Sequence, residues 1–348
     1  MQLVAYGAQD IYLTGNPQIT FFKVVYRRHT NFAIESIDQT FNGQVAQDKK
    51  ITVTIARNGD LLHRIYLEMI CADVNNAFRH INYAEIEIGG QVIDKQYGEW
   101  MAVWTSLSHS YDQAVMLGKM VDGTGLAATP VYIPLQFWFC RNPGLALPLI
   151  ALQYHEVKLN IQFANVAAIT GVTVWADYIF LDTDERRRFA QVSHEYLIEQ
   201  VQFSNDLKSA AGSNQIELRF NHPVKELVWV VEDSAEFGGS TVVDNAVIQL
   251  NGQDRFKRRV GAYFTKVQRY QHHSGAGDQL LNSQAIHVYS FGLKPEEHQP
   301  SGTCNFSRID NAIINYNQTG ADNTFRMWAV NYNVLRIMSG MGGLAYSN

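Results

Sequence analysis

The sequence has few of the residues and motifs on which sites of chemistry usually depend. It contains three cysteines, Cys71, Cys140 and Cys304, which are far apart and form no CxxC pair. This argues against a structural zinc site or a disulfide framework and favours buried free thiols. No GxSxG or HxH pattern occurs either, so neither a nucleophile elbow nor a cupin-type metal site is indicated. We therefore predict no catalytic residue, no cofactor and no metal.

Strong charge and long apolar runs are also missing. Only 18% of residues are charged and the formal net charge is -5, which gives no indication of direct sequence-specific nucleic-acid binding. No apolar run approaches the ~18 residues of a membrane span. The N-terminal stretch MQLVAYGAQDIYLTG lacks the basic and apolar regions of a signal peptide. We expect synthesis in the cytosol without secretion.

Alternation of apolar and polar residues dominates what is present. Aromatic residues make up 12% of the chain, and strands favour aromatic and β-branched side chains. Turn residues such as Asn58-Gly59-Asp60 and Asn142-Pro143-Gly144 separate the alternating stretches. The stretches that we predict to be strands are 49–57, 63–70, 84–90, 131–139, 155–163, 173–181, 214–220, 225–232, 246–252, 285–293, 311–317 and 325–337.

Helical spacing is confined to two stretches. Residues 94–117 place Trp100, Trp104 and Leu107 at helical intervals, and TDERRRFAQ (183–191) has the composition of a short helix. Many short strands with few helices predict an all-β protein built from sandwiches.

The two halves of the chain resemble each other. AEIEIGGQVIDK (84–95) aligns with AVIQLNGQDRFK (246–257), after which Gly98 meets Gly261 and Trp100 meets Tyr263. Three further pairs of stretches occur in the same order: 57–69 with 220–231, 155–160 with 310–315, and 174–181 with 327–335. A duplicated β domain is the simplest explanation. The last pair aligns Trp175 with Trp328, which we expect to anchor the cores of the two domains.

Other conspicuous residues have structural explanations. The Gly-Gln pairs at 90–91 and 252–253 lack the spacing of phosphate-binding loops, so tight turns are the better interpretation. His272 and His273 are expected at the surface or in a turn. Arg186, Arg187 and Arg188 are expected to pair locally with the neighbouring acidic residues.

Several longer motifs resemble the major capsid proteins of large double-stranded DNA viruses, most closely those of chlorella-type algal viruses. The motifs include the N-terminal QLVAYGAQDIYLTGNPQITFFKVVYRRHTNFAIES, NPGLALPLIALQYHEVKL, DYIFLDTDERRRFAQ, PSGTCNFSRIDNA and NYNVLRIMSGMGGLAY. The resemblance covers nearly the whole chain. It implies a double jelly roll, that is, two tandem eight-stranded antiparallel jelly-roll sandwiches with short helices in the connections.

The resemblance also implies an organisation and a function. It predicts an N-terminal segment (1–25), a first jelly-roll domain (26–183), a linker (184–193) and a second jelly-roll domain (194–348). Three chains would form a pseudo-hexagonal homotrimeric capsomer that contacts neighbouring capsomers in an icosahedral virion shell. The N-terminal segment and a basic cluster at its end would lie on the inner face, against minor capsid proteins or an internal membrane. The basic cluster consists of Lys23, Arg27, Arg28 and His29.

One departure from the family concerns its outer decoration. Relatives usually carry longer loops, whereas here 163–174, 205–213 and 233–245 are short, which puts glycan attachment in doubt. Two sequons are present, at Asn317 and Asn305. Asn317 is expected in a loop after a strand and is the better glycosylation candidate, and Asn305 is expected to have a structural role.

Three alternatives to a major capsid protein stay open at this point. The chain could be a minor or paralogous capsid subunit, or a carbohydrate-binding jelly-roll module at the virion surface. A metal-dependent jelly-roll enzyme is disfavoured by the missing ligand spacing.

Overall fold

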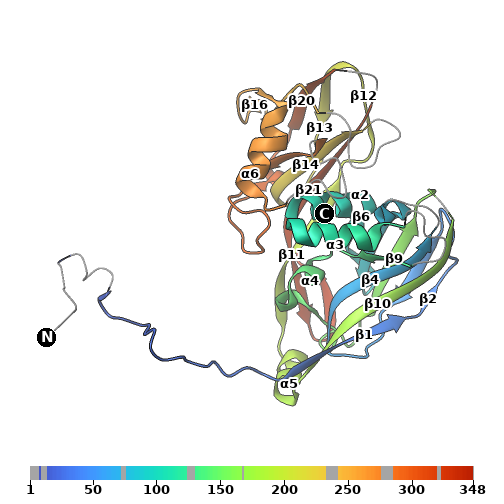
Figure 1. Cartoon of the computed structure of the whole chain (residues 1–348), viewed down its shortest axis with the longest axis vertical. Coiled ribbons are helices and arrows are strands. Elements are labelled where there is room, and N and C mark those ends of the chain that lie inside the picture. The colour runs from blue at the N-terminus through green and yellow to red at the C-terminus, as the bar shows by residue number, and fades with distance from the viewer. Residues whose placement is uncertain are drawn as a thin grey trace.

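The computed structural model describes residues 8, 14–71, 76–123, 130–166, 168–232, 242–275, 285–319 and 323–347. Most of the stretch examined for a signal peptide, and 233–241 of one expected loop, lie outside these residues. The described strands form four antiparallel sheets, two in each half of the chain. Figure 1 shows the two halves one above the other, with α2 and α3 between them.

The first half folds into a sandwich of two facing sheets. Its outer sheet has the order β1 (Phe32–Gln39), β10 (Ile169–Leu181), β4 (Leu61–Cys71) and β7 (Val131–Pro134), with β8 (Leu147–Pro148) also paired to β4. Its second sheet has the order β2 (Phe41–Asn42), β3 (Lys50–Thr54), β9 (Val157–Phe163), β5 (Ile81–Ile88) and β6 (Gln91–Tyr97).

The second half folds in the same way. One sheet has the order β11 (His194–Phe203), β21 (Asn323–Met338), β14 (Pro223–Glu232) and β18 (His287–Ser290), with β12 (Leu207–Ser209), β19 (Cys304–Asn305) and β22 (Met341–Leu344) attached. The other has the order β13 (Gly212–Glu217), β20 (Ala312–Gln318), β15 (Asn245–Leu250) and β16 (Gln253–Asp254), with β17 (Arg259–Val260) attached to β15.

The strand orders confirm the predicted duplication and the double jelly roll. In each half the first strand pairs with the long strand near the end of that half, β10 or β21, and the chain crosses repeatedly between the two sheets, as in a jelly roll. All four aligned pairs of stretches fall on equivalent strands. These pairs are β4 with β14, β5 with β15, β9 with β20, and β10 with β21.

The Gly-Gln stretches are hairpin turns. Gly89 and Gly90 join β5 to β6 with φ of 58° and 86°, and Asn251 and Gly252 join β15 to β16 with φ of 51° and 78°. Two successive positive φ angles are the geometry of the type I′ turn, which matches strand twist and favours glycine and asparagine. The turns therefore repeat because the hairpin repeats.

The helices lie in the connections between strands. The helix predicted at 94–117 is wrong for residues 94–97, which belong to β6, and the rest forms two helices, whereas the helix at 183–191 is present as predicted. The helical elements are η1 (Ala77–His80), α2 (Gly98–Ser108), α3 (Tyr111–Val121), α4 (Trp138–Arg141), η2 (Pro143–Leu145), α5 (Thr183–Gln191), η3 (Tyr263–Val267, a π-helix), α6 (Gln268–His272) and η5 (Phe306–Arg308).

One predicted strand, 131–139, is wrong in its second part. Strand β7 ends at Pro134, and α4 begins at Trp138. Proline has no backbone N–H to continue a ladder. Phe137, Trp138 and Phe139 are instead buried in the core, where the rings of Phe137 and Phe139 stack 5.6 Å apart. The apolar run thus reflects burial and does not indicate a strand.

Two glycines at equivalent positions fix the helices that follow the β5–β6 and β15–β16 hairpins. A Cβ on Gly98 would lie 2.1 Å from the Ile81 carbonyl oxygen, and a Cβ on Gly261 would lie 1.8 Å from that of Val243. Both contacts are with backbone atoms, which cannot rotate away. Each helix therefore begins against its own sandwich only because its first residue has no side chain.

We predict that Gly98→Ala and Gly261→Ala each lower the free energy of unfolding by roughly 2–4 kcal/mol, because backbone must shift to admit the methyl group. Gly171→Ala is the matched control, since its Cβ would meet only the Ile70 side chain at 3.4 Å. Denaturant titrations of the three variants measure the effect. Equal stability of Gly98→Ala and Gly171→Ala would contradict this explanation.

Candidate functional site: the seam between the two sandwiches

Helix α2 occupies the centre of the contact between the two halves, which we call the seam. Ten of its eleven residues are buried, with Ser108 the exception. A helix buried all round has structure on every side. The Trp100 ring lies 5.8 Å from the ring of Trp104 in the same helix and 5.8 Å from that of Trp328 in the second half. Trp328 in turn stacks on Phe203 at 5.6 Å.

The second half contributes one face of a sheet to the seam. Side chains from its strands belong to the same continuous apolar core as the first sandwich, among them Ile198, Val228, Val230, Val288, Trp328 and Val330. The opposite face of β14 and β21 supplies Trp229, Met327 and Ala329 to a separate core inside the second sandwich. Strand β14 is consequently buried on both faces, which makes the seam an extension of the first core.

The two tryptophans that the alignment paired do not anchor the two cores, so that prediction is wrong. Trp328 is buried in the seam, and the second core is built around Trp229. Trp175 is half-buried and points away from its own core, and its indole N–H donates to the Glu68 carboxylate at 2.6 Å. Because side chains alternate along a strand, both tryptophans lie on the outward face of equivalent strands. The alignment of the two halves does not indicate which face of a strand points to the core.

Ion pairs join the two halves at the ends of the seam. The Arg326 guanidinium in β21 pairs with Glu99 of α2 at 2.7 Å and with Glu232 and Asp206 of its own half. Arg141 of α4 pairs with Glu199 of β11 at 3.0 Å. The two pairs that cross the seam, Arg326 with Glu99 and Arg141 with Glu199, are largely buried and hydrogen-bonded, so they fix the register of the two halves more firmly than exposed pairs would.

Several basic side chains surround the Glu199 carboxylate at the end of the seam near α4. The Lys225 ammonium, whose side chain is 2% exposed, lies 2.8 Å from its carboxylate. Burial alone would raise the pKa of Glu199, but Lys225, His298 and Arg141 outweigh it and lower this pKa to about 2. Arg141 also covers the face of Trp104, with its guanidinium carbon 4.2 Å from the ring centroid. Arg141 thus takes part both in an ion pair with Glu199 and in a cation–π contact with Trp104.

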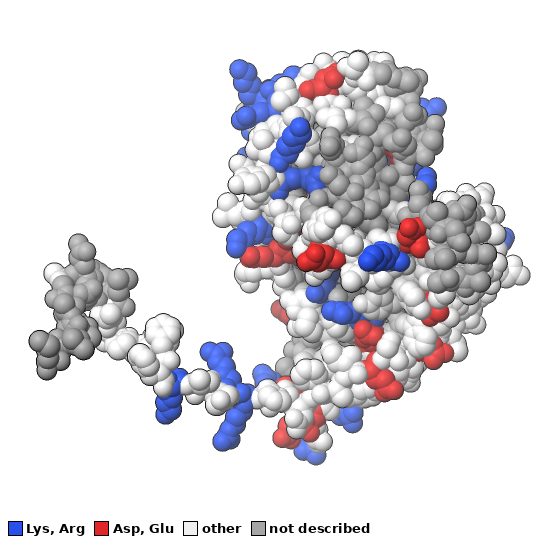
Figure 2. Space-filling model, viewed as in Figure 1, with Lys and Arg blue, Asp and Glu red and all other residues white. Residues whose placement is uncertain are grey.

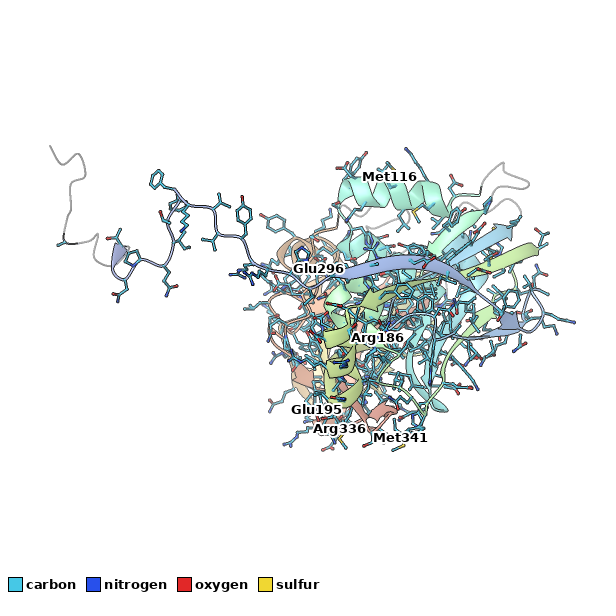
Figure 3. All side chains as sticks on the ribbon, turned by 90° about the horizontal axis from the view of Figure 1, so that it is seen from below. Met116, Arg186, Glu195, Glu296, Arg336 and Met341 are labelled. Atoms are coloured by element: carbon cyan, nitrogen blue, oxygen red, sulfur yellow. The ribbon has the colours of Figure 1, made fainter. Side chains whose placement is uncertain are left out.

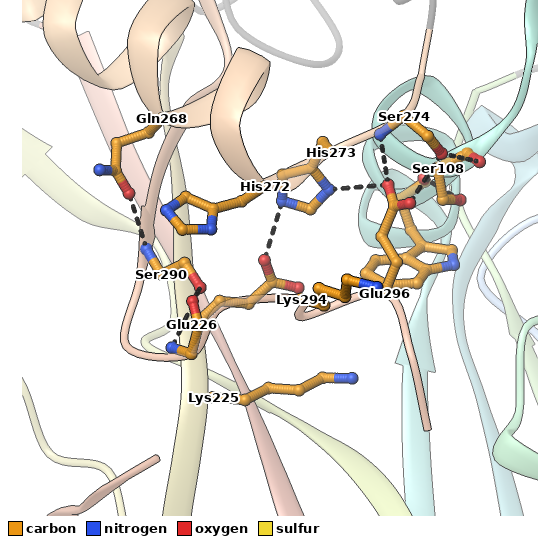
Figure 4. Close-up of polar contacts among 12 residues, drawn as sticks. Ser108, Lys225, Glu226, Gln268, His272, His273, Ser274, Ser290, Lys294 and Glu296 are labelled. Carbon is orange, nitrogen blue, oxygen red and sulfur yellow. Dashed lines mark hydrogen bonds and ion pairs between the residues drawn. The ribbon is translucent and has the colours of Figure 1, made fainter. Parts of the chain in front are cut away.

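His273 is the centre of a buried hydrogen-bond network, shown in Figure 4. Its Nε2 lies 2.9 Å from Glu226 and its Nδ1 lies 3.1 Å from Glu296. Burial would lower the pKa of His273, but Glu226 first and then Glu296 outweigh it and raise this pKa to about 9. The next residues close on the C-terminal end of α2, because the Gly275 N–H donates to the Leu107 carbonyl at 2.7 Å.

The prediction that both histidines lie at the surface or in a turn is therefore wrong for His273. Its side chain is 1% exposed, and its ring meets the Trp104 ring edge-on at 6.5 Å. A signal was present in the sequence. Glu226 directly precedes the apolar run LVWVV (227–231), and a carboxylate buried in a strand needs a cationic partner. The sequence did not show that this partner lies 47 residues further along the chain.

The two basic clusters noted in the sequence lie outside the seam. The guanidinium of Arg186 does not pair with its acidic neighbours: it lies 2.9 Å from Asp60, the residue before β4, while Asp182 caps α5. Figure 3 shows Arg186 on this helix. Lys23 and Arg28 are exposed on an extended arm, residues 14–31, that leaves the body of the molecule (Figures 1 and 3).

The histidines and cysteines considered as metal ligands or nucleophiles do not form a site in the described ranges. Within the described ranges, no three His, Cys, Asp or Glu side chains come together as metal ligands would. The cysteines are free thiols, with Cys71 buried and Cys140 and Cys304 half-buried. Burial raises the pKa of all three, which opposes thiolate formation. No helix in the described part of the chain is long and apolar enough to span a bilayer.

The glycosylation candidates differ in their surroundings. Asn317 lies inside β20 and not in the loop after it, and its Oδ1 is buried. Asn305 is exposed, but its Oδ1 accepts a hydrogen bond from the Ser307 N–H and caps η5. Glycosylation of Asn317 or Asn305 stays a prediction of the sequence.

A hollow of about 600 Å³ lies beside the seam, lined by Tyr66, Trp104, Gln136, Arg141 and Glu296 among others. Its aromatic and polar lining resembles that of sugar sites. Trp104, however, is only 4% exposed and has Arg141 over its ring. The hollow therefore does not offer the open aromatic platform on which a sugar ring stacks.

Two jelly rolls of the same strand order, joined by an apolar seam, define the class of double jelly-roll proteins. The model for the major capsid protein N-terminus matches residues 20–182, and the model for the large eukaryotic DNA virus major capsid protein matches residues 185–343. The chain belongs to the family of major capsid proteins of large eukaryotic DNA viruses.

Individual relatives agree with this assignment. The chain is 53% identical to the major capsid protein of Pyramimonas orientalis virus and 44% identical to that of Paramecium bursaria Chlorella virus 1, covering 100% of this chain and 99% of each relative. A structure of the PBCV-1 virus capsid matches with a TM-score of 0.84 at 39% identity, over 94% of this chain and 100% of that one. Faustovirus major capsid protein, at 10% identity and a TM-score of 0.77, shares the fold.

This chain is shorter than the alignments with its relatives. The alignments with the Pyramimonas orientalis virus and Paramecium bursaria Chlorella virus 1 proteins extend over 394 and 436 positions, although this chain has 348 residues. These relatives therefore carry insertions that this chain lacks, as the resemblance suggested.

We predict that the seam weakens as the pH rises from 6.5 to 9. Because the pKa of His273 is raised to about 9 from 6.5, its stabilisation is complete below pH 6.5 and is lost as the pH passes 9. The expected loss in free energy of unfolding is up to about 3 kcal/mol. His273→Gln should show a flatter pH profile in denaturant titrations, and the difference between the two profiles isolates this side chain. Parallel profiles would contradict the prediction.

Proposed function

We propose that this chain is a structural subunit whose three copies form a pseudo-hexagonal homotrimeric capsomer of an icosahedral shell. The observation that carries the proposal is the seam, which holds two sandwiches of the same strand order as one rigid unit. Three such units present six similar lobes with threefold symmetry. Six similar lobes can tile a shell hexagonally, and each capsomer then meets neighbouring capsomers through similar surfaces.

The proposal includes a division of the chain and a place of action. The division is an N-terminal segment (1–25), sandwiches over 26–183 and 194–348, and the linker 184–193, which contains most of α5. The chain acts in the virion after synthesis in the host cytoplasm, and it catalyses no reaction. The names of its relatives support the structural role, and the dispersed histidines and cysteines support the absence of catalysis.

The N-terminal arm supports a second contact, with minor capsid proteins or an internal membrane. Apolar side chains on the arm are almost fully exposed, with Phe21 at 92% and Phe22 at 98%. Lys23, Arg27 and Arg28 stand beside them. Exposed apolar and basic residues in one short extended segment fit a partner surface that is apolar and acidic.

We predict that the purified chain sediments as a stable species of three times 39.4 kDa at micromolar concentration. Analytical ultracentrifugation over a range of concentrations measures it. A chain that stays monomeric throughout would contradict the capsomer.

We also predict that deletion of residues 1–25 leaves the capsomer trimeric and reduces the yield of assembled shells. The arm makes no strand pairing with the sandwiches, so its removal should not affect their folding. Electron microscopy of shells assembled with the deleted and full-length chains provides the comparison. Equal yields would contradict a role for the arm.

A further inference from the structure

The sheets that face the seam match residue by residue between the two halves. In each sheet four paired residues form one row across the four strands. In the second half the row is Phe203, Trp328, Val228 and Val288. In the first half the row is Asp38, Trp175, Tyr66 and Pro134. Trp175 is therefore the structural counterpart of Trp328, and the outward face around it is the counterpart of the face that the seam buries.

The two faces differ in what covers them. Trp328 is 1% exposed because α2 of the first half lies on it. Around Trp175, which is half-buried, Asp38 is exposed and Tyr132 of β7 is 37% exposed. On β1 the residues Ile34 and Phe32 are 53% and 62% exposed. The first half thus presents to solvent the face that the second half uses for contact.

Helix α2, which lies at the centre of the seam, also has a counterpart in the second half. Helical residues 261–272, which include η3 and α6, begin at Gly261 as α2 begins at Gly98, and both glycines abut backbone. Trp100, Trp104 and Leu107 of α2 are buried. The residues at the same distances from Gly261 are Tyr263, Val267 and Tyr270, and of these Val267 is 41% exposed and Tyr270 90% exposed.

The exposed helix and the exposed face have complementary charge. Arg258, Arg259 and Lys266 are exposed on or beside the helical segment. Figure 2 shows Lys and Arg gathered along the edge of the half that carries α6. The face around Trp175 carries Glu68 and Asp177 in addition to Asp38, and it also carries the exposed Arg64 of β4. The acidic residues outnumber this cation, and opposite predominant charge favours contact between the two surfaces.

We propose that helical segment 261–272 of one chain docks on the outward face of sheet β1-β10-β4-β7 of a second copy. In this contact Tyr263 meets Trp175 as Trp100 meets Trp328 within one chain, and Val267 takes the place of Trp104. The inference rests on the proposed capsomer, because a head-to-tail contact between identical chains closes into a ring of three only when each chain is rotated by a third of a turn relative to the previous one.

The composition of the two contacts fits this assignment. The internal face, with Val228 and Val288, never meets water in the folded chain. The corresponding positions on the exposed face are Tyr66 and Pro134, and the charged residues around them keep the free subunit soluble until it assembles. One docking geometry is therefore used twice, with an apolar version inside the chain and a more polar version between chains.

Two variants test the contact in the full chain. Val267→Glu with Tyr270→Glu disables the helix, and Ser36→Arg with Asp38→Arg disables the face. We expect each variant alone to be monomeric by native mass spectrometry. We expect an equimolar mixture to form a two-chain complex and no trimer, because one intact helix then meets one intact face. Val192→Glu with Met341→Glu, at positions 54% and 51% exposed, is the control and should stay trimeric.

Each other outcome has a distinct meaning. If the natural chain and both variants are trimers, the docking contact is wrong and the capsomer stands. If the natural chain is monomeric, the capsomer and the contact are both wrong. Monomeric variants that do not combine on mixing exclude a head-to-tail contact. If a double variant loses its unfolding transition, Tyr270→Ala and Asp38→Ala replace it, and each should weaken trimer association at least about tenfold; unchanged association would overturn the contact.

Discussion

The close approach of α2 to two sheets at once is the contact on which the rest of the structure depends. Gly98 lets the helix begin against the backbone of its own sandwich, and Trp100 and Trp104 then reach the second half. Because β14 and β21 are buried on both faces, neither half could expose this surface to water without a large cost in free energy. The two sandwiches therefore behave as one body, and their relative orientation is a property of the fold.

Buried charge gives the apolar seam its specific register. An apolar face alone would tolerate small shifts, whereas Glu199, Glu226 and Arg326 each need partners at fixed positions. The partners come from both halves, since Arg141 and Glu99 belong to the first. The interaction that orients the lobes is thus polar, and the interaction that holds them together is apolar.

The sequence was sufficient for the fold because its signals are local and repeated. Alternation, the two Gly-Gln hairpins and four aligned pairs of stretches indicated two equivalent sandwiches, and the strand orders agree. The seam was not predictable in the same way. Whether Trp328 faces its own core or a neighbour depends on packing between strands far apart in sequence, and the partner of Glu226 is likewise distant. Periodicity shows that a face is apolar, but it does not show what covers that face.

Duplication explains why the two tryptophans have different surroundings. After a domain is copied, each copy keeps a helix that docks and a face that receives, but the chain can join only one such pair internally. The internal pair became apolar around Trp328, and the other helix and face remain exposed with opposite charge, near Tyr263 and Trp175. In such a chain one helix and one face are joined internally, while the other helix and the other face are free. The chain must then either associate with further copies or leave these two surfaces in water. The unequal burial of two equivalent tryptophans is thus what the proposed assembly, built from a repeated contact, would produce.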